Sequence, residues 1–176
     1  MLIGVPKETL PGELRAPLVP VTVKKLVGLG FEVTVEPGVG EHAGFPDAQY
    51  TDAGAKLEAD RDALLGAADI LLRIRKPEAE ELGKLKKGAI HASLLDPFNE
   101  KELIGKLAEA GVTAISMEMV PRSTRAQKMD VLSSQANLAG YVTVILAARE
   151  SNKILPMMMT PAGTISPAKV FVIGAG

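Results

Sequence analysis

Short apolar segments alternate with helix-forming segments through residues 2–116, and this order constrains the fold more than any other feature. Short apolar runs are typical of buried strands, whereas apolar residues spaced three and four apart indicate helices. The expected strands are residues 2–5, 31–35, 69–74, 89–94 and 112–116, and the expected helices are residues 22–29, 47–53, 59–67, 78–85 and 99–109. We expect Asp47 and Asn99 to cap their helices.

Strands that are joined through helices form a parallel sheet with helices on both faces and right-handed crossovers. The sequence therefore predicts an α/β fold whose N-terminal domain is a Rossmann-like parallel sheet. Ligands of such sheets bind outside the carboxyl ends of the strands. The loops that follow Val5, Val35, Ile74, Leu94 and Ser116 should therefore share one ligand-binding edge.

Three arginines fall near this expected edge. Arg15 lies in a loop between apolar neighbours, while Arg73 and Arg75 end a strand. A carboxylate or a phosphate could bind to them, although an exposed or structural arginine is the more common case. His91 lies within an apolar strand, which favours a core histidine over a catalytic base.

Residues 120–141 concentrate polar side chains at the start of an otherwise apolar helix. Apolar residues recur at helical spacing from residue 129 to residue 146, which predicts a helix with one buried face. Arg122, Gln127, Asp130 and Ser133 offer the donors and acceptors that a nicotinamide carboxamide requires. A plainer interpretation stays open at this point, in which Arg122 and Asp130 form a surface ion pair and the remaining residues cap the helix.

The C-terminal segment predicts the opening of a second domain. After an irregular connection at residues 156–167, an apolar strand at residues 168–173 runs into Gly174, Ala175 and Gly176, and the chain ends there. A strand before Gly-x-Gly is the first half of a dinucleotide-binding fingerprint, so we expect the natural chain to continue. The expected domains are an N-terminal domain at 1–125, a connecting helix at 126–150 and the truncated start of a Rossmann domain at 151–176.

Composition excludes several classes of protein. The chain has no cysteine and two histidines, which excludes disulfides and thiolate ligands and argues against a metal site. Twenty basic and 21 acidic residues give a net charge of −1, which disfavours a nucleic-acid partner. No apolar run is expected to reach the length of a membrane span, and the N-terminus has no signal pattern, so we expect a cytoplasmic protein.

Several segments resemble one known family. Residues 122–141 closely resemble the signature of the NAD(H)-binding domain I of the alpha subunit of proton-translocating NAD(P) transhydrogenases. The segments that resemble this family and its alanine dehydrogenase relatives are GVPKET, PGELRAPLVP, EPGVGEHAGFPD, DILLRIRKP and PAKVFVIGAG. The resemblance covers the whole chain, and residues 122–141 separate the two branches.

The resemblance implies a function and a set of partners. It implies that Arg122, Gln127, Asp130 and Ser133 orient the nicotinamide of NAD(H), and that residues 174–176 begin the pyrophosphate loop. The implied reaction moves hydride between NADH and NADP(H) held on a partner component, with no catalytic residue in this chain. It also implies a homodimer beside NADP-binding and membrane-spanning components, peripheral to the inner face of the membrane. We expect the truncated chain to be inactive alone.

Two alternatives remain from the sequence. The alanine dehydrogenase branch binds its keto acid through an arginine and a lysine and uses a histidine as acid and base. Arg15 matches the arginine, but Arg75 and Asp96 stand where the lysine and the histidine would be. Keto-acid reduction needs a proton donor, whereas transfer between two nicotinamides does not, so transhydrogenation is favoured. The third hypothesis is a non-catalytic assembly fragment whose long helix packs on a partner.

Overall fold

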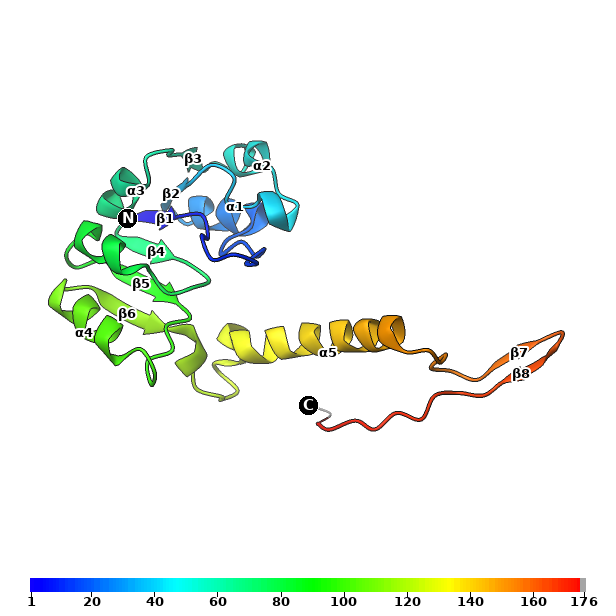
Figure 1. Ribbon diagram of the computed structural model, residues 1–176. Helices are drawn as coiled ribbons and strands as arrows, with labels where there is room; N and C mark the ends of the chain where they lie inside the picture. Colours follow the sequence, from blue (N-terminus) through cyan, green and yellow to red (C-terminus); the bar gives the residue numbers. More distant parts are fainter. Residues whose placement is uncertain (175–176) are drawn as a thin grey trace. The chain divides into compact units, whose positions relative to one another are not determined.

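The computed structural model describes residues 1–174 and divides the chain into two compact units (Figure 1). Unit 1 is Met1–Pro121, and unit 2 is Arg122–Gly176, of which residues 175–176 lie outside the described part. The expected domain boundaries at residues 125 and 150 stay predictions.

Unit 1 is built on a six-stranded parallel sheet with the order β3-β2-β1-β4-β5-β6. The strands are β1 (Leu2–Val5), β2 (Glu32–Val35), β3 (Lys56–Leu57), β4 (Ile70–Leu72), β5 (Ile90–Ser93) and β6 (Thr113–Ser116). The chain first moves outward from β1 to β3 and then returns to β4 on the other side of β1. This reversal creates a switch point between β1 and β4, where loops diverge and a crevice opens.

Helices cover both faces of the sheet, because each crossover between parallel strands carries at least one helical segment. The α-helices are α1 (Pro20–Gly28), α2 (Asp47–Asp52), α3 (Arg61–Ala67) and α4 (Lys101–Glu109), and the 3₁₀ helices are η1 (Glu41–Ala43), η2 (Ala79–Lys84) and η3 (Met117–Met119). The α/β, Rossmann-like fold expected from the sequence is therefore confirmed.

Two hydrophobic clusters divide the core between the two faces. One cluster joins Ile3 and Val5 of β1 to α1 and to Tyr50 of α2. The other joins Leu71 of β4 to the helices α3, η2 and α4. Gly4 permits this second packing, because a Cβ atom there would lie 2.7 Å from the Cβ of Ala68. A strand of alternating large side chains on both faces would hold α3 away from the sheet.

Several local expectations for unit 1 are wrong at the ends of elements. Asn99 does not cap α4, because its side chain donates to Asp96 and Glu100 takes the cap position. Asp47 is the first residue of α2, and its carboxylate accepts the Gly38 amide at 2.7 Å. The helix expected at residues 78–85 is the 3₁₀ helix η2, and the two-residue edge strand β3 was not expected.

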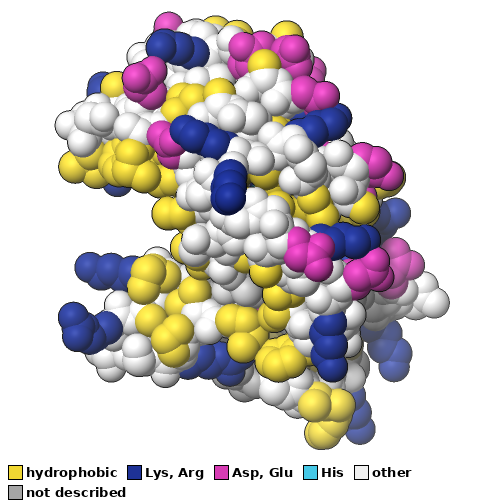
Figure 2. Space-filling model, turned by 90° about the vertical axis from the view of Figure 1, so that its left-hand side faces the viewer, with side chains coloured by type: hydrophobic (Ala, Val, Ile, Leu, Met, Phe, Trp, Pro, Cys, Tyr) yellow, Lys and Arg dark blue, Asp and Glu magenta, His cyan; other side chains and the backbone are white. Residues whose placement is uncertain are grey.

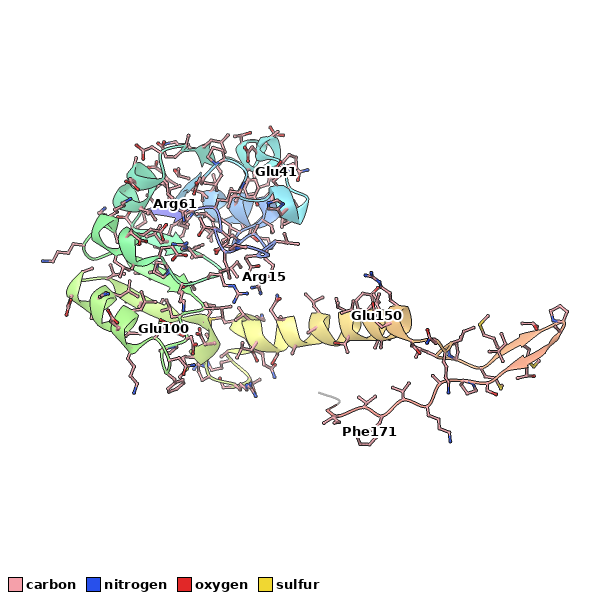
Figure 3. All side chains as sticks on the ribbon, viewed as in Figure 1. Arg15, Glu41, Arg61, Glu100, Glu150 and Phe171 are labelled. Carbon is pink, nitrogen blue, oxygen red and sulfur yellow. The ribbon has the colours of Figure 1, made fainter. Side chains whose placement is uncertain are left out.

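Unit 2 consists of a polar loop, a long helix and a hairpin. The elements are η4 (Gln127–Met129), α5 (Val131–Glu150), β7 (Met158–Thr160) and β8 (Gly163–Ile165). The hairpin is antiparallel, so the expectation of an irregular connection at residues 156–167 is wrong. Residues 168–173 form no strand in the described structure, where Phe171 is 88% exposed (Figure 3). A parallel strand needs a paired neighbour, and no described strand pairs with this segment.

Helix α5 corrects two expectations about the long apolar segment. Within the described chain none of its residues is buried, so the expected single buried face is wrong. Its 20 residues are also long and apolar enough, by length and composition, to cross a membrane, contrary to the expectation that no segment would be. Ser133, Gln135 and Asn137 interrupt the apolar run, so the expectation based on an uninterrupted run missed this helix. Core helices of globular proteins share these properties.

The surface of the molecule carries mixed charge. On the face shown in Figure 2, basic and acidic side chains lie among hydrophobic ones. This distribution agrees with the net charge of −1.

Candidate functional site

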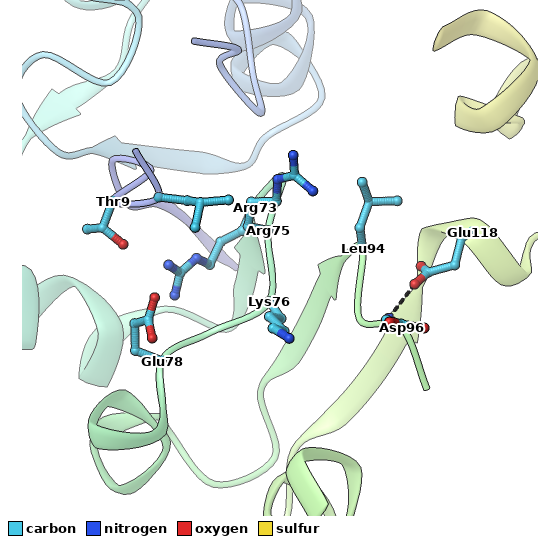
Figure 4. Close-up of a pocket in the computed structure, with 9 residues that line it drawn as sticks. Thr9, Arg73, Arg75, Lys76, Glu78, Leu94, Asp96 and Glu118 are labelled. Atoms are coloured by element: carbon cyan, nitrogen blue, oxygen red, sulfur yellow. Dashed lines mark hydrogen bonds between the residues drawn. The ribbon is translucent and has the colours of Figure 1, made fainter. Parts of the chain in front are cut away.

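A cavity of about 330 Å³ lies at the carboxyl edge of the sheet, at the switch point (Figure 4). Its lining comes from the loops after four strands: Thr9 and Leu10 after β1, Arg73, Arg75, Lys76 and Glu78 after β4, Leu94 and Asp96 after β5, and Glu118 after β6. The expected ligand edge is thus hollow at the point where the topology predicts a crevice.

The loop after β1 is tied to the end of β4 by two glutamates. The Glu8 carboxylate accepts the backbone amides of Ile74 at 2.6 Å and Arg75 at 3.2 Å. Glu13, whose side chain is 3% exposed, accepts from Arg15 Nε at 2.6 Å and from Arg75 Nε at 2.7 Å. The hydrogen bonds from Arg15, assisted by Arg75, lower the pKa of Glu13 to about 2. Arg15 and Arg75, of which Arg75 lines the cavity, are therefore both engaged by one buried carboxylate.

The third arginine belongs to a buried chain of ion pairs behind the cavity. Arg73 pairs with Glu81 of η2, and both side chains are buried. Glu81 also accepts from Arg61 Nε at 2.7 Å, and Arg61 contacts Glu36 at the end of β2. Burial raises the pKa of Glu81, but the charge and hydrogen bond of Arg73 outweigh this and leave the pKa below its usual value. Arg73 is therefore a fixed part of the cavity wall.

No histidine is among the described residues that line the cavity. His91 is fully buried on β5, and its Nε2 lies 3.0 Å from Ser93 Oγ. Burial, with the nearby Arg73 charge, lowers the pKa of His91 to about 4, so the ring is neutral at pH 7. Asp96 does line the cavity, but Asn99 Nδ2 donates to both of its carboxylate oxygens, at 3.0 Å each.

The polar loop expected to bind nicotinamide lies in unit 2. The side chains of Arg122 and Gln127 are exposed. Asp130 caps α5, because its carboxylate accepts the Ser133 amide at 2.9 Å and the Ser133 hydroxyl at 2.6 Å. These hydrogen bonds, with a smaller effect of the Arg122 charge, lower the pKa of Asp130. Asp130 and Ser133 are thus brought together, with Asp130 itself as the helix cap rather than the serine or glutamine of the plainer interpretation.

The expected pyrophosphate loop is described only at its first residue. Gly174 has a φ of +86°, a conformation that glycine adopts readily. Ala175 and Gly176 lie outside the described residues.

The sequence did not reveal the glutamates that hold the arginines around the cavity. Glu8, Glu13 and Glu81 fix the three arginines that the sequence singled out. Only Glu13 had a local signal, since it stands two residues before Arg15 in a loop. Glu8 reaches a strand end 66 residues away, which no local pattern indicates.

Comparisons with known proteins support one assignment. The family model described as "Alanine dehydrogenase/PNT, N-terminal domain" matches residues 4–139. The chain is 44% identical to an NAD(P) transhydrogenase subunit alpha polypeptide of Rhodospirillum rubrum, covering all of this chain and 47% of that protein. It is 31% identical to alanine dehydrogenase of Mycobacterium tuberculosis, covering all of this chain and 48% of that protein.

Solved structures agree with this assignment. A transhydrogenase from Sinorhizobium meliloti matches with a TM-score of 0.95 and 47% identity, over all of this chain and 52% of that one. An L-alanine dehydrogenase matches with a TM-score of 0.83 and 28% identity, over 95% of this chain and 46% of that one. The chain thus spans about half the length of these relatives. It belongs to the family of alanine dehydrogenase and transhydrogenase N-terminal domains, and it resembles transhydrogenase alpha subunits more than alanine dehydrogenases.

Proposed function

We propose that this chain belongs to the NAD(H)-binding component of a transhydrogenase, which passes hydride between NADH and NADP held on a partner component. The observation that carries the proposal is the loop at residues 122–130, where the exposed side chains of Arg122 and Gln127 precede the Asp130 helix cap. The greater identity to transhydrogenase alpha subunits supports the same function.

The donors and acceptors of this loop fit a nicotinamide carboxamide. Gln127 offers both an amide donor and a carbonyl acceptor, and Arg122 offers several donors. The Asp130 carboxylate accepts two bonds from Ser133, which leaves lone pairs for a further donor. Gln127 and Arg122 would therefore hold the carboxamide, while Asp130 and Ser133 would fix the direction in which the loop enters α5.

The contribution of the chain is orientation. The cofactor, when bound, supplies the hydride chemistry. Side chains that fix the plane and the rotation of one ring convert binding into a reactive geometry. No proton donor beside the reacting carbon is required for hydride transfer between two nicotinamides.

The unit 1 cavity weighs against an amino-acid dehydrogenase. Arg75, which lines the cavity, already shares Glu13 with Arg15. His91 on strand β5 is buried and neutral. A keto-acid reductase needs a group that can protonate the product oxygen. At the position where the alanine dehydrogenase branch has this histidine, the chain has Asp96, whose carboxylate is hydrogen-bonded to Asn99.

The proposal extends to partners and location. Similarity to proteins named subunit alpha supports an assembly with NADP-binding and membrane-spanning components. We further propose that the protein forms a homodimer and that hydride transfer is coupled to proton translocation. We also propose that it lies in the cytoplasm at the inner face of the membrane. Analytical ultracentrifugation of the full-length protein, with and without its partner components, tests the assembly.

Arg122→Ala and Gln127→Ala test the proposed role of the loop. In the full-length protein assembled with its NADP-binding partner, we expect NADH affinity to change by less than about tenfold. The single-turnover hydride transfer rate should fall by roughly 100-fold, because misoriented rings lose reactive geometry. Matched controls are Arg149→Ala and Gln49→Ala, which remove the same exposed groups elsewhere.

Unchanged transfer in both loop variants would refute the proposed function. Alanine-dependent reduction of NAD by the full-length protein would favour the dehydrogenase alternative instead. A protein that binds no NADH would favour the assembly hypothesis.

A further inference from the structure

Ala126 is the one buried side chain among the described residues 122–174 of unit 2. It is 5% exposed, whereas its neighbours Arg125 and Gln127 are both exposed. In the loop that presents Arg122 and Gln127, a single methyl group is therefore withdrawn from solvent. Nothing in the sequence pattern distinguishes this alanine from the exposed ones that follow it in α5.

Backbone hydrogen bonds connect Ala126 to both sides of the loop. Its amide donates to the Ser123 carbonyl at 3.0 Å, and the Gln127 amide donates to the same carbonyl at 3.1 Å. On the other side, the Met129 amide donates to the Ala126 carbonyl at 2.8 Å. Ala126 is thus the residue through which two successive turns are joined.

The second turn leads directly into the helix cap. The Asp130 amide donates to the Gln127 carbonyl at 3.3 Å, and the Asp130 carboxylate then accepts from Ser133. A displacement at Ala126 therefore acts on Gln127 through one peptide bond and on Asp130 through hydrogen bonds. Arg122 lies one residue before the Ser123 carbonyl that closes the first turn.

We propose that Ala126 is a positioning residue for hydride transfer: burial of its methyl group fixes the loop so that Arg122 and Gln127 are presented together. This inference rests on the proposed function of the loop. A larger side chain at a buried position forces the side chain or the backbone to shift. A shift of about 1 Å in an orienting group can reduce the rate of a reaction by roughly 100-fold.

A graded series of substitutions at this position tests the inference. In the full-length protein with its NADP-binding partner, single-turnover hydride transfer is measured for Ala126→Gly, Ala126→Val and Ala126→Leu. We expect a fall of a few fold for glycine and of roughly 10- to 100-fold for valine and leucine. NADH affinity should change by less than about tenfold. The matched control is Ala108→Leu, the same enlargement at an exposed position of α4.

The amplitude of the single turnover separates mispositioning from loss of folded protein. A variant that merely unfolds loses amplitude and keeps its rate constant, whereas a displaced loop lowers the rate constant at full amplitude. With NADH deuterated at the transferred position, slow variants should show a full primary isotope effect. A rate constant unchanged in Ala126→Leu, while Arg122→Ala remains slow, would overturn the role of Ala126 and leave the proposed function standing. If both substitutions leave the rate unchanged, the proposed function fails as well.

Discussion

The two units of this chain are stabilised in different ways. Unit 1 buries large apolar side chains on both faces of its sheet, among them Val5, Tyr50 and Leu71. In the described part of unit 2, Ala126 alone is buried, and helix α5 exposes large apolar residues such as Leu138 and Val144. Unit 1 is therefore held by packing, while unit 2 keeps its conformation through local hydrogen bonds. The proposed nicotinamide loop combines both, because its hydrogen-bonded turns meet at the buried Ala126.

The largest expected difference between the units comes from removing one leucine from each. Leu65 is fully buried in α3, and Leu138 is 57% exposed in α5. We expect Leu65→Ala to lower the free energy of unfolding of unit 1 by about 2–5 kcal/mol, because it leaves a cavity. Leu138→Ala in the same chain should change it by no more than about 0.5 kcal/mol. Urea unfolding followed by circular dichroism measures both.

Amide hydrogen exchange then shows which strands and helices lose stability in each leucine variant. Amides of β4 and β5 should exchange faster in Leu65→Ala and at the original rate in Leu138→Ala. Equal losses of stability in the two variants would contradict the contrast between a packed unit and a locally bonded one.

A pH titration sharpens the comparison, because only unit 1 holds a buried histidine among the described residues. The pKa of His91 is about 4 in the folded chain, against an ordinary value of 6.5. The unfolded chain therefore binds this proton more readily, so stability falls as the pH drops from about 6.5 to about 4. The loss from this group should approach roughly 3 kcal/mol.

His91→Gln isolates this contribution, since glutamine stays neutral and can still bond to Ser93. Unfolding free energies at pH 7, 6, 5 and 4 should fall less steeply in the variant than in the parent. Protonation of Glu81 and other carboxylates affects both proteins and cancels in the difference. Parallel pH profiles for the two proteins would show that His91 has the same pKa in the folded and the unfolded chain, which would contradict the prediction.

The sequence predicted unit 1 far better than unit 2, for a physical reason. Strands such as β4 and β5 are buried on one face and partly buried on the other, so their apolar runs were sufficient to identify them. Errors in unit 1 arose where a side chain had two possible partners, as when Asn99 bonded to Asp96 rather than to a helix end. In unit 2 the pattern of α5 predicted a helix correctly but could not say what would cover it.

The candidate site was predicted in part. The polar residues Arg122, Gln127, Asp130 and Ser133 were identified by their density in an apolar segment and by family resemblance. The cavity could be expected only as an edge of the sheet, because its shape depends on carboxylates that reach it from distant loops. Ala126 was not identified, since burial of a small apolar residue depends on tertiary contacts rather than on sequence.

The smallest expected effect tests the local bonds that hold unit 2. Asp130→Ala removes the cap formed with Ser133 at the start of α5, where helical packing contributes little. We expect the first turn of the helix to open roughly five times more often in this variant, and less often than that in Asp130→Asn, which can still accept the Ser133 amide. Exchange of the Ser133 and Ser134 amides, read by NMR, should quicken in the alanine variant, while amides of the unit 1 sheet keep their rates. Because the pKa of Asp130 is lowered by these bonds, the parent cap should persist on acidification until this carboxyl is protonated and then weaken. If Asp130→Ala also accelerated exchange throughout the unit 1 sheet, the two units would not be stabilised separately.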